Sequence, residues 1–159
     1  MNKNFTVLEQ ADKAWQKTNL DINPSGVETA QLRLWLVDDN DRHRQLFARK
    51  FEQKLGLACV GQFASAEAAI LALRKELPPE VILLDVEMPE MNGATAVKTI
   101  KALSPGIQVF MFSTFFNASR AVEARKGGAS GYFRKSDIGQ VMQMLRTLLH
   151  PVVSDFKPE

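Results

Sequence analysis

Acidic side chains stand at two separate places in this chain of 159 residues, each directly after a short apolar run. Asp38 and Asp39 follow one run and Asp85 follows another, while Ser113 and Lys135 come after two further apolar stretches. Carboxylates that are brought close together repel one another, so such a set favours a divalent cation with oxygen ligands. Mg²⁺ fits this chemistry because it needs few carboxylates, keeps several waters and bridges to phosphoryl oxygens.

The apolar runs alternate with amphipathic stretches along the chain. Strands are predicted over residues 32–37, 57–63, 81–84, 107–112 and 131–134, and helices over residues 40–54, 66–76, 94–103, 118–126 and 138–149. The continuous apolar run at 81–84, bounded by turn residues, is typical of a strand buried on both faces of a parallel sheet. Five strands alternating with five helices predict an α/β fold, a doubly wound parallel sheet with helices on both faces. Right-handed crossovers favour the flavodoxin-like strand order 2-1-3-4-5.

That fold would bring the candidate residues together. Asp38, Asp39, Asp85, Ser113 and Lys135 all lie at or just after the carboxyl ends of predicted strands. In a doubly wound sheet these ends form one edge, which is where such folds place their chemistry. The sequence therefore predicts that four separate segments converge on one small site.

The predicted organisation is an N-terminal extension (residues 1–31), one α/β domain (residues 32–150) and a C-terminal tail (residues 151–159). Apolar residues at helical spacing predict a short amphipathic helix over residues 5–17, which either packs on the domain or forms a partner or dimer surface.

Composition narrows the class of protein. The hydrophobic fraction of 45% and the charged fraction of 24% are ordinary for a soluble globular protein. A net charge of +2 gives no argument for nucleic acid. No apolar run is long enough to span a membrane and no secretory signal begins the chain, so we expect a cytoplasmic protein. The one cysteine, Cys59, is expected in the core, and His43 and His150 are expected to be exposed on helices.

At these positions the sequence resembles the receiver domain of two-component response regulators. The resemblance covers residues 32 to about 149 and rests on the following motifs: the Asp38-Asp39 pair, Asp85 with Met88-Pro89 and Gly93, Ser113, and the sequence GASGYFRK at residues 128–135. Each motif is short, but their order and their places at strand ends make the combination specific.

The resemblance implies a phosphorylation switch that depends on Mg²⁺. Asp85 would be the phosphoacceptor, receiving a phosphoryl group from a phosphohistidine on a histidine kinase or phosphotransfer protein. Asp39 and, less directly, Asp38 match the acidic pair that holds Mg²⁺ together with Asp85, and the main-chain carbonyl of Glu87 would be a further ligand. The domain would be a signalling module and not an enzyme.

The resemblance also implies how phosphorylation would change the surface of the domain. Ser113 would hydrogen-bond one phosphoryl oxygen and Lys135 would pair with another. Tyr132 matches the aromatic residue whose position reports the switch. The output surface would be the face formed by residues 118–149, which would bind a downstream protein target or a second copy of the chain. We expect neither nucleic acid nor membrane to be bound by these residues themselves.

Several residues depart from the usual receiver pattern. Lys135 is followed by Ser136, where many receivers have a proline and often a cis peptide bond. A cis bond that precedes a residue other than proline costs about 2.5–4 kcal/mol. We therefore expect the bond between Lys135 and Ser136 to be trans or strained. Glu87, two residues after the acceptor, would modulate the lifetime of the phosphorylated form. Thr114 and the two phenylalanines after it replace smaller residues, and would narrow access to the acceptor or form an apolar partner surface.

Three other functions fit parts of the same pattern. A phosphatase of the haloacid dehalogenase type also forms an aspartyl phosphate, but the chain is short for a hydrolase with a cap over its substrate. A flavin- or nucleotide-binding module on this fold would need a glycine- or hydroxyl-rich loop where Asp38 and Asp39 stand. A receiver-like scaffold would bind partners without phosphorylation. The complete set of acceptor, acids, hydroxyl and lysine favours the working switch.

Overall fold

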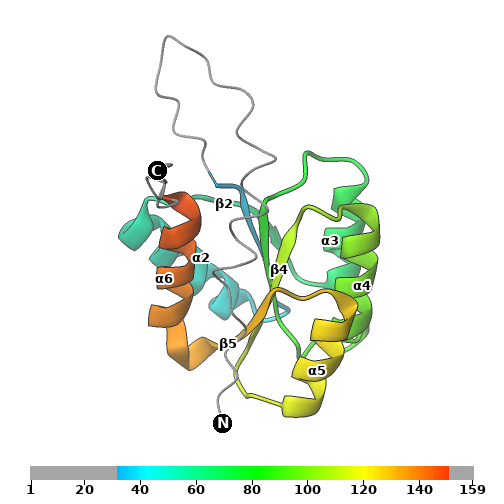
Figure 1. Cartoon of the computed structure of the whole chain (residues 1–159). Helices are drawn as coiled ribbons and strands as arrows, with labels where there is room; N and C mark the ends of the chain where they lie inside the picture. Colours follow the sequence, from blue (N-terminus) through cyan, green and yellow to red (C-terminus); the bar gives the residue numbers. More distant parts are fainter. Residues whose placement is uncertain (1–31, 151–159) are drawn as a thin grey trace, which may run out of the picture.

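A parallel five-stranded sheet forms the centre of the computed structural model, which describes residues 32–150 (Figure 1). The strands are β1 (Leu34–Val37), β2 (Cys59–Phe63), β3 (Val81–Leu84), β4 (Gln108–Ser113) and β5 (Gly131–Arg134). Their order in the sheet is β2-β1-β3-β4-β5 and every neighbouring pair is parallel, so the predicted order is confirmed. The predicted helix over residues 5–17 and the tail at residues 151–159 lie outside the described residues.

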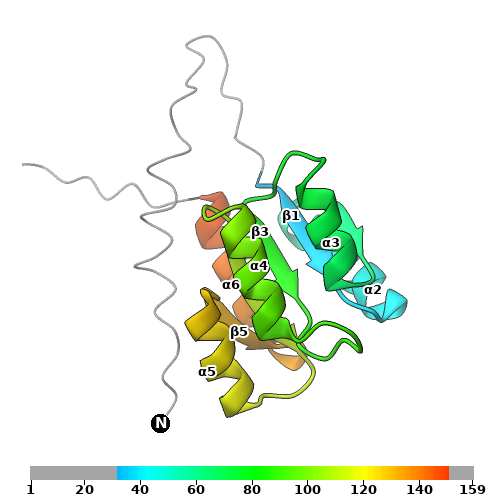
Figure 2. The same cartoon turned by 90° about the vertical axis from the view of Figure 1, so that its right-hand side faces the viewer.

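Helices cover both faces of the sheet, as the alternation predicts. The bounds are α2 (Asp41–Leu55), α3 (Ala66–Leu73), α4 (Gly93–Leu103), α5 (Ala118–Gly127) and α6 (Ile138–Leu149), with the short 3₁₀ turn η1 (Lys135–Asp137) before α6. Figures 1 and 2 show α2 and α6 on one face, and α3, α4 and α5 on the other. Within residues 32–150, none of these helices has the length and apolar character needed to cross a membrane.

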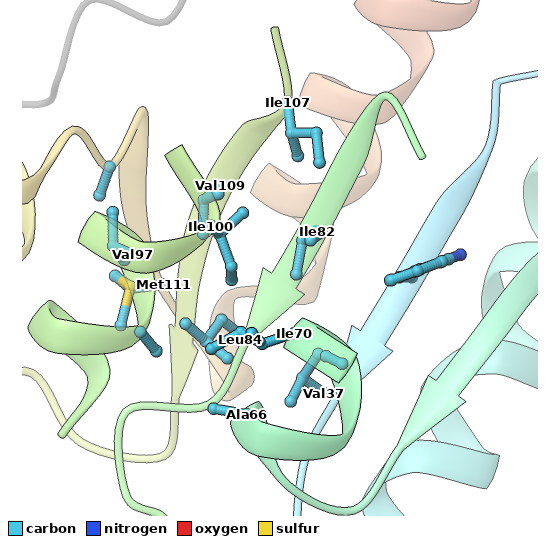
Figure 3. Packing of buried hydrophobic residues seen from close by; sticks show 14 of the residues in the cluster. Val37, Ala66, Ile70, Ile82, Leu84, Val97, Ile100, Ile107, Val109 and Met111 are labelled. Carbon is cyan, nitrogen blue, oxygen red and sulfur yellow. The ribbon is translucent and has the colours of Figure 1, made fainter. Parts of the chain in front are cut away.

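The three central strands are apolar at nearly every position because both of their faces are covered. In β1, Leu34 and Leu36 pack toward α2 and α6, whereas Trp35 and Val37 pack toward the opposite layer. The same alternation runs through β3 and β4, and Figure 3 shows part of the cluster beneath α3 and α4, including Val37, Ile82, Leu84 and Val109. This two-sided burial fixes the strands, and with them the positions of the residues at their carboxyl ends.

Three predicted boundaries are wrong by two residues or more. β1 begins at Leu34 and not at residue 32. The other two differ because a turn uses residues assigned to the neighbouring element. β2 begins at Cys59 and not at residue 57, because Gly56 ends α2 in the left-handed conformation (φ 62°) and Leu57 is then buried outside the strand. α3 ends at Leu73 and not at Glu76, because the amides of Arg74 and Lys75 bond to carbonyls three residues back instead of four.

Side-chain caps begin the described helices other than α6, which follows the 3₁₀ turn η1. Asn40 accepts a hydrogen bond from the amide of His43, Ser65 from that of Ala68, and Asn117 from that of Arg120, at 3.0–3.1 Å. The cap predicted at Ser65 is confirmed. Because each of these three caps terminates a loop within a few residues of its strand, these loops are short.

Candidate functional site

The three aspartates meet at the carboxyl edge of the sheet. β1 and β3 are neighbours and Val37 lies opposite Leu84, so the residues that follow, Asp38 and Asp85, are adjacent. One oxygen from each of Asp38, Asp39 and Asp85 lies within 4.8 Å of the other two. Asp38 and Asp85 are buried, with 5% and 6% of their surface exposed, whereas Asp39 is exposed. The site is therefore a buried pair of carboxylates with a third at its rim.

Lys135 bridges the buried pair. Its Nζ donates to Oδ2 of Asp38 at 2.6 Å and to Oδ2 of Asp85 at 3.3 Å. The lysine follows β5 directly, and 7% of its side chain is exposed. The structure thus brings together the ends of β1, β3 and β5, as the sequence predicts.

The backbone holds the other oxygen of each buried carboxylate. The amide of Asn40 donates to Oδ1 of Asp38 at 2.8 Å, and the amide of Glu87 donates to Oδ1 of Asp85 at 3.1 Å. In both cases the donor lies two residues after the aspartate, so the local turn orients the side chain. Both Oδ2 atoms consequently face Lys135.

Burial raises the pKa of Asp85 from 3.8 to about 6. The hydrogen bond from the Glu87 amide and the positive charge of Lys135 act in the opposite direction, while the charge of Asp38 adds to the increase. Three carboxylates face one buried ammonium, so the negative charge of the ionised site is only partly compensated. Closely spaced oxygen donors with excess negative charge fit a hard divalent cation such as Mg²⁺.

Ser113 is the last residue of β4 and its side chain is completely buried. The register pairs Leu84 with Met111, which places Ser113 beside the segment that follows Asp85. Its Oγ has no hydrogen-bond partner among residues 32–150. A buried hydroxyl without a partner is unusual, and it offers a donor at the edge of the acidic site.

Tyr132 lies apart from the acidic cluster. Its hydroxyl donates to the carbonyl oxygen of Phe115 at 2.9 Å, and its ring meets that of Phe116 edge to face with centroids 5.2 Å apart. Phe115 and Phe116 are 68% and 59% exposed, and Thr114 is exposed as well. Tyr132 therefore ties the loop between β4 and α5 to β5.

Glu87 is not one of the three clustered acids. Its side chain is half exposed and one carboxylate oxygen lies 3.5 Å from a guanidinium nitrogen of Arg120 at the start of α5. The loop after the acceptor is thereby linked to the helix after Ser113. On the other side of the site, the bond between Lys135 and Ser136 is trans, because residues 32–150 contain no cis peptide bond.

Two residues of α2 were missed by the sequence analysis. His43 was expected to be exposed, but it is partly buried and its Nδ1 lies 3.1 Å from Nζ of Lys135. Arg44 donates to the carbonyl oxygen of Asp38 at 2.5 Å and pairs with Asp41. The sequence feature that indicates their proximity to the site is their position in the first turn of a helix that begins three residues after Asp38.

The other histidine and the cysteine are remote from this chemistry. His150 is exposed, as expected. Cys59 packs against the core but is only partly buried, so the prediction of a buried residue is inexact. Its thiol donates to the carbonyl of Gly61 at 3.1 Å, and burial raises its pKa to about 11.

Comparisons with a family model, with related sequences and with solved structures all indicate the same family. A model of the response regulator receiver domain family matches residues 34–146. The chemotaxis protein CheY of Thermotoga maritima is 30% identical over 103 residues, covering 65% of this chain and 84% of that protein. The crystal structure of a LuxR-family response regulator from Aurantimonas sp. superposes with a TM-score of 0.67 at 29% identity, covering 74% of this chain and 84% of the other.

Some relatives are much longer than the matched region. A protein-glutamate methylesterase/protein-glutamine glutaminase of Alkalilimnicola ehrlichii is 36% identical over 129 residues, which is 78% of this chain and 33% of the relative. The chain thus spans about a third of the methylesterase relatives that it matches. It spans 54% of the response regulator GacA of Pseudomonas protegens, at 32% identity over 72% of this chain.

Proposed function

The chain belongs to the response regulator receiver domain family, and we propose that it is a phosphorylation-dependent signalling switch with Asp85 as its phosphoacceptor. The observation that carries the proposal is the position of Asp85. Its carboxylate lies at the end of β3, within reach of a second buried acid and of a buried lysine. A rigid strand holds the nucleophile while neighbouring elements supply the charges that phosphoryl transfer requires.

The reaction is a transfer between two proteins. A carboxylate oxygen of Asp85 attacks the phosphorus of a phosphohistidine on a histidine kinase or phosphotransfer protein. A P–O bond to Asp85 forms as the P–N bond breaks, and the departing imidazole nitrogen keeps the bonding electron pair. Lys135, which pairs with Asp85, would pair with one phosphoryl oxygen, and the unpartnered hydroxyl of Ser113 would donate to another.

Mg²⁺ is the cofactor that the donor set fits. Asp38, Asp39 and Asp85 would hold it, with the main-chain carbonyl of Glu87 as a further ligand. When bound, Mg²⁺ supplies positive charge to the oxygens of the transferring phosphoryl group. Lys135, which now donates to Asp38 and Asp85, would turn to the phosphoryl group, and Asp38 would be free to act as a metal ligand.

The phosphoryl group would change the surface through β4 and β5. A hydrogen bond from Ser113 to the phosphoryl group would draw the start of the β4–α5 loop toward Asp85. Tyr132 would respond because its hydroxyl binds that loop at Phe115. The affected surface is the face of residues 118–149, where a downstream protein or a second copy of the chain would bind. Glu87 and Thr114, at the rim, would set the lifetime of the phosphorylated form.

In this proposal the domain is a signalling module and not an enzyme, and its histidine kinase or phosphotransfer partner would phosphorylate it in the cytoplasm. Any output activity of a longer protein would belong to other residues.

Phosphoramidate tests the proposal, because its P–N bond reproduces that of phosphohistidine. The chain is incubated with this donor in Mg²⁺ or in EDTA, and the intact mass is recorded. We expect one added phosphoryl group in Mg²⁺ and none in EDTA. Asp85→Asn should remain unmodified, whereas Glu90→Gln, a change of an exposed acid in the same loop, should behave as wild type. Unmodified wild-type protein under every condition would instead favour a receiver-like scaffold that binds partners without phosphorylation.

A further inference from the structure

We propose that His43 is a positioning residue that holds Lys135 in place for phosphoryl transfer. The inference rests on the proposed function and deepens it, since it assigns a role to a side chain outside the set of acceptor, metal ligands, hydroxyl and lysine. His43 lies on α2, while Lys135 follows β5, 92 residues later in the chain.

The contacts of Lys135 account for the whole of its hydrogen-bonding capacity. An ammonium group has three N–H donors. Three acceptors surround Nζ: Oδ2 of Asp38 at 2.6 Å, Nδ1 of His43 at 3.1 Å and Oδ2 of Asp85 at 3.3 Å. Because the ammonium group only donates, Nδ1 of His43 must accept, and the ring proton then lies on Nε2.

Both carboxylates are needed elsewhere during the reaction. In the proposed function Asp38 would hold Mg²⁺, and Asp85 would become an acyl phosphate. His43 is the one partner of Lys135 that the reaction leaves in place. It therefore supplies a fixed acceptor while Nζ moves from the carboxylates to the phosphoryl oxygens, and this restricts where the ammonium group can lie.

Packing fixes the imidazole in this orientation. The amide of His43 is bound to the capping side chain of Asn40 at 3.1 Å, which sets the first turn of α2. The ring meets that of Phe47 edge to face with centroids 6.2 Å apart, and Phe47 in turn packs on Phe112 of β4. The side chain of His43 is 39% exposed, so one side of the ring faces solvent while Nδ1 faces the site.

Two substitutions separate hydrogen bonding from packing. His43→Leu keeps apolar contact with Phe47 and removes the acceptor. His43→Asn places Oδ1 near the former position of Nδ1 and loses the ring. At saturating Mg²⁺ we expect His43→Leu to lower the rate of phosphorylation by phosphoramidate roughly tenfold to a hundredfold, as expected for a lost hydrogen bond to a charged group. His43→Asn should recover most of that rate.

Gln45→Leu is the matched control, because Gln45 is an exposed residue of the same helix and the change is also to leucine. Its rate should equal that of wild type, and thermal unfolding of each variant reports whether the fold is kept. In a Lys135→Ala background, His43→Leu should have no further effect, since the two residues act through one contact. A full additional loss in that background would overturn the inference, as would equal rates for His43→Leu and wild type or equally low rates for both His43 variants.

An NMR measurement tests the contact without any phosphorylation. The ¹⁵N signals of the His43 ring should show an unprotonated Nδ1 and a proton on Nε2 in wild type, and a mixture of tautomers in Lys135→Ala. A mixture already present in wild type would overturn the inference. If phosphoramidate does not modify the wild type, the proposed function fails while this spectrum still reports on the contact. If the wild type is modified and His43→Leu matches it, only the role of His43 fails.

Discussion

Asp38 and Asp85 are held in the same way, although they come from different strands. Each carboxylate receives one hydrogen bond from the amide two residues later and one from Lys135. The local turn orients each acid, and the lysine joins the two. The two acids and the lysine are therefore joined in one hydrogen-bonded group before any ligand binds.

The raised pKa of Asp85 makes stability depend on pH. The folded chain keeps a proton on Asp85 up to about pH 6, whereas the ordinary value is 3.8. Folding therefore favours the protonated form, and the contribution of this group to stability falls as pH rises from about 4 to about 6. In EDTA at pH 8, Asp85→Asn should raise the free energy of unfolding by roughly 1–3 kcal/mol, because a neutral side chain replaces a buried charge.

Urea unfolding of both proteins in EDTA at pH 4, 6 and 8 checks this prediction. The gain of Asp85→Asn over wild type should be largest at pH 8 and should disappear near pH 4. A variant that is less stable than wild type at pH 8 would show that the ion pair with Lys135 outweighs the burial of the charge.

Ser113 should matter for phosphorylation and not for folding. Its buried Oγ has no partner in the described part of the chain, and such a group destabilises the fold by roughly 1–3 kcal/mol. Ser113→Ala should therefore unfold at the same or a higher temperature than wild type. Phosphorylation by phosphoramidate should fall roughly tenfold or more, because a donor to the transferred group is lost.

Ser130→Ala provides the comparison, since Ser130 is also buried and precedes β5. Its phosphorylation rate should not change. A Ser113→Ala variant with an unchanged rate would remove the hydroxyl from the proposed chemistry, and a large loss of stability would point to a structural role.

The contact between β1 and β2 is set by one glycine. A Cβ at Gly61 would lie 2.5 Å from Cδ1 and 2.6 Å from Nε1 of Trp35, and 2.9 Å from the ring of Phe63. Trp35 is fully buried, so its ring has little room to move. Gly61→Ala should lower the free energy of unfolding by roughly 1–3 kcal/mol and change the fluorescence of Trp35.

Gly106→Ala is the control for this change, because a Cβ at Gly106 would have no neighbour within 4 Å. Chemical unfolding should leave the control within about 0.5 kcal/mol of wild type. Equal stability of Gly61→Ala and Gly106→Ala would mean that the Trp35 ring can shift without cost.

The strands were predicted closely because two covered faces impose continuous apolar runs on β1, β3 and β4. The ends of elements were predicted less well. The turns at Gly56 and after Leu73 end a helix without any break in the hydrophobic pattern of the sequence. Asp38, Asp85 and Lys135 could be brought together from the sequence because strand ends share one edge. The first turn of α2 indicates that His43 lies near the site, but its contact with Lys135 could not be predicted, because the direction of the side chain depends on the rotation of α2 about its axis.

Two apolar layers support one polar edge in the molecule as a whole. Helices α2 and α6 cover one face, and α3, α4 and α5 cover the other, so the carboxyl edge is where charge can gather (Figures 1 and 2). A cation that binds this edge only in the folded chain must stabilise the entire domain.

Mg²⁺ should therefore raise the thermal unfolding midpoint of the whole domain. At about 100 times its Kd, a ligand specific for the folded state adds roughly 3 kcal/mol to the free energy of unfolding. Calorimetry at pH 8 should show this increase in wild type and a smaller one in Asp39→Asn, which loses one of the three candidate ligands. NaCl of equal ionic strength is the control, and an equal shift with NaCl would argue against a specific site.

Chemical identification of the phosphorylated residue tests most directly whether Asp85 is the phosphoacceptor. After reaction with phosphoramidate and Mg²⁺, borohydride reduces an aspartyl phosphate to homoserine, and peptide mass mapping locates the change. Homoserine is expected at position 85 alone, at the end of β3. Modification at Asp38 or Asp39, or phosphorylation without any reducible acyl phosphate, would contradict the assignment of Asp85 as the acceptor.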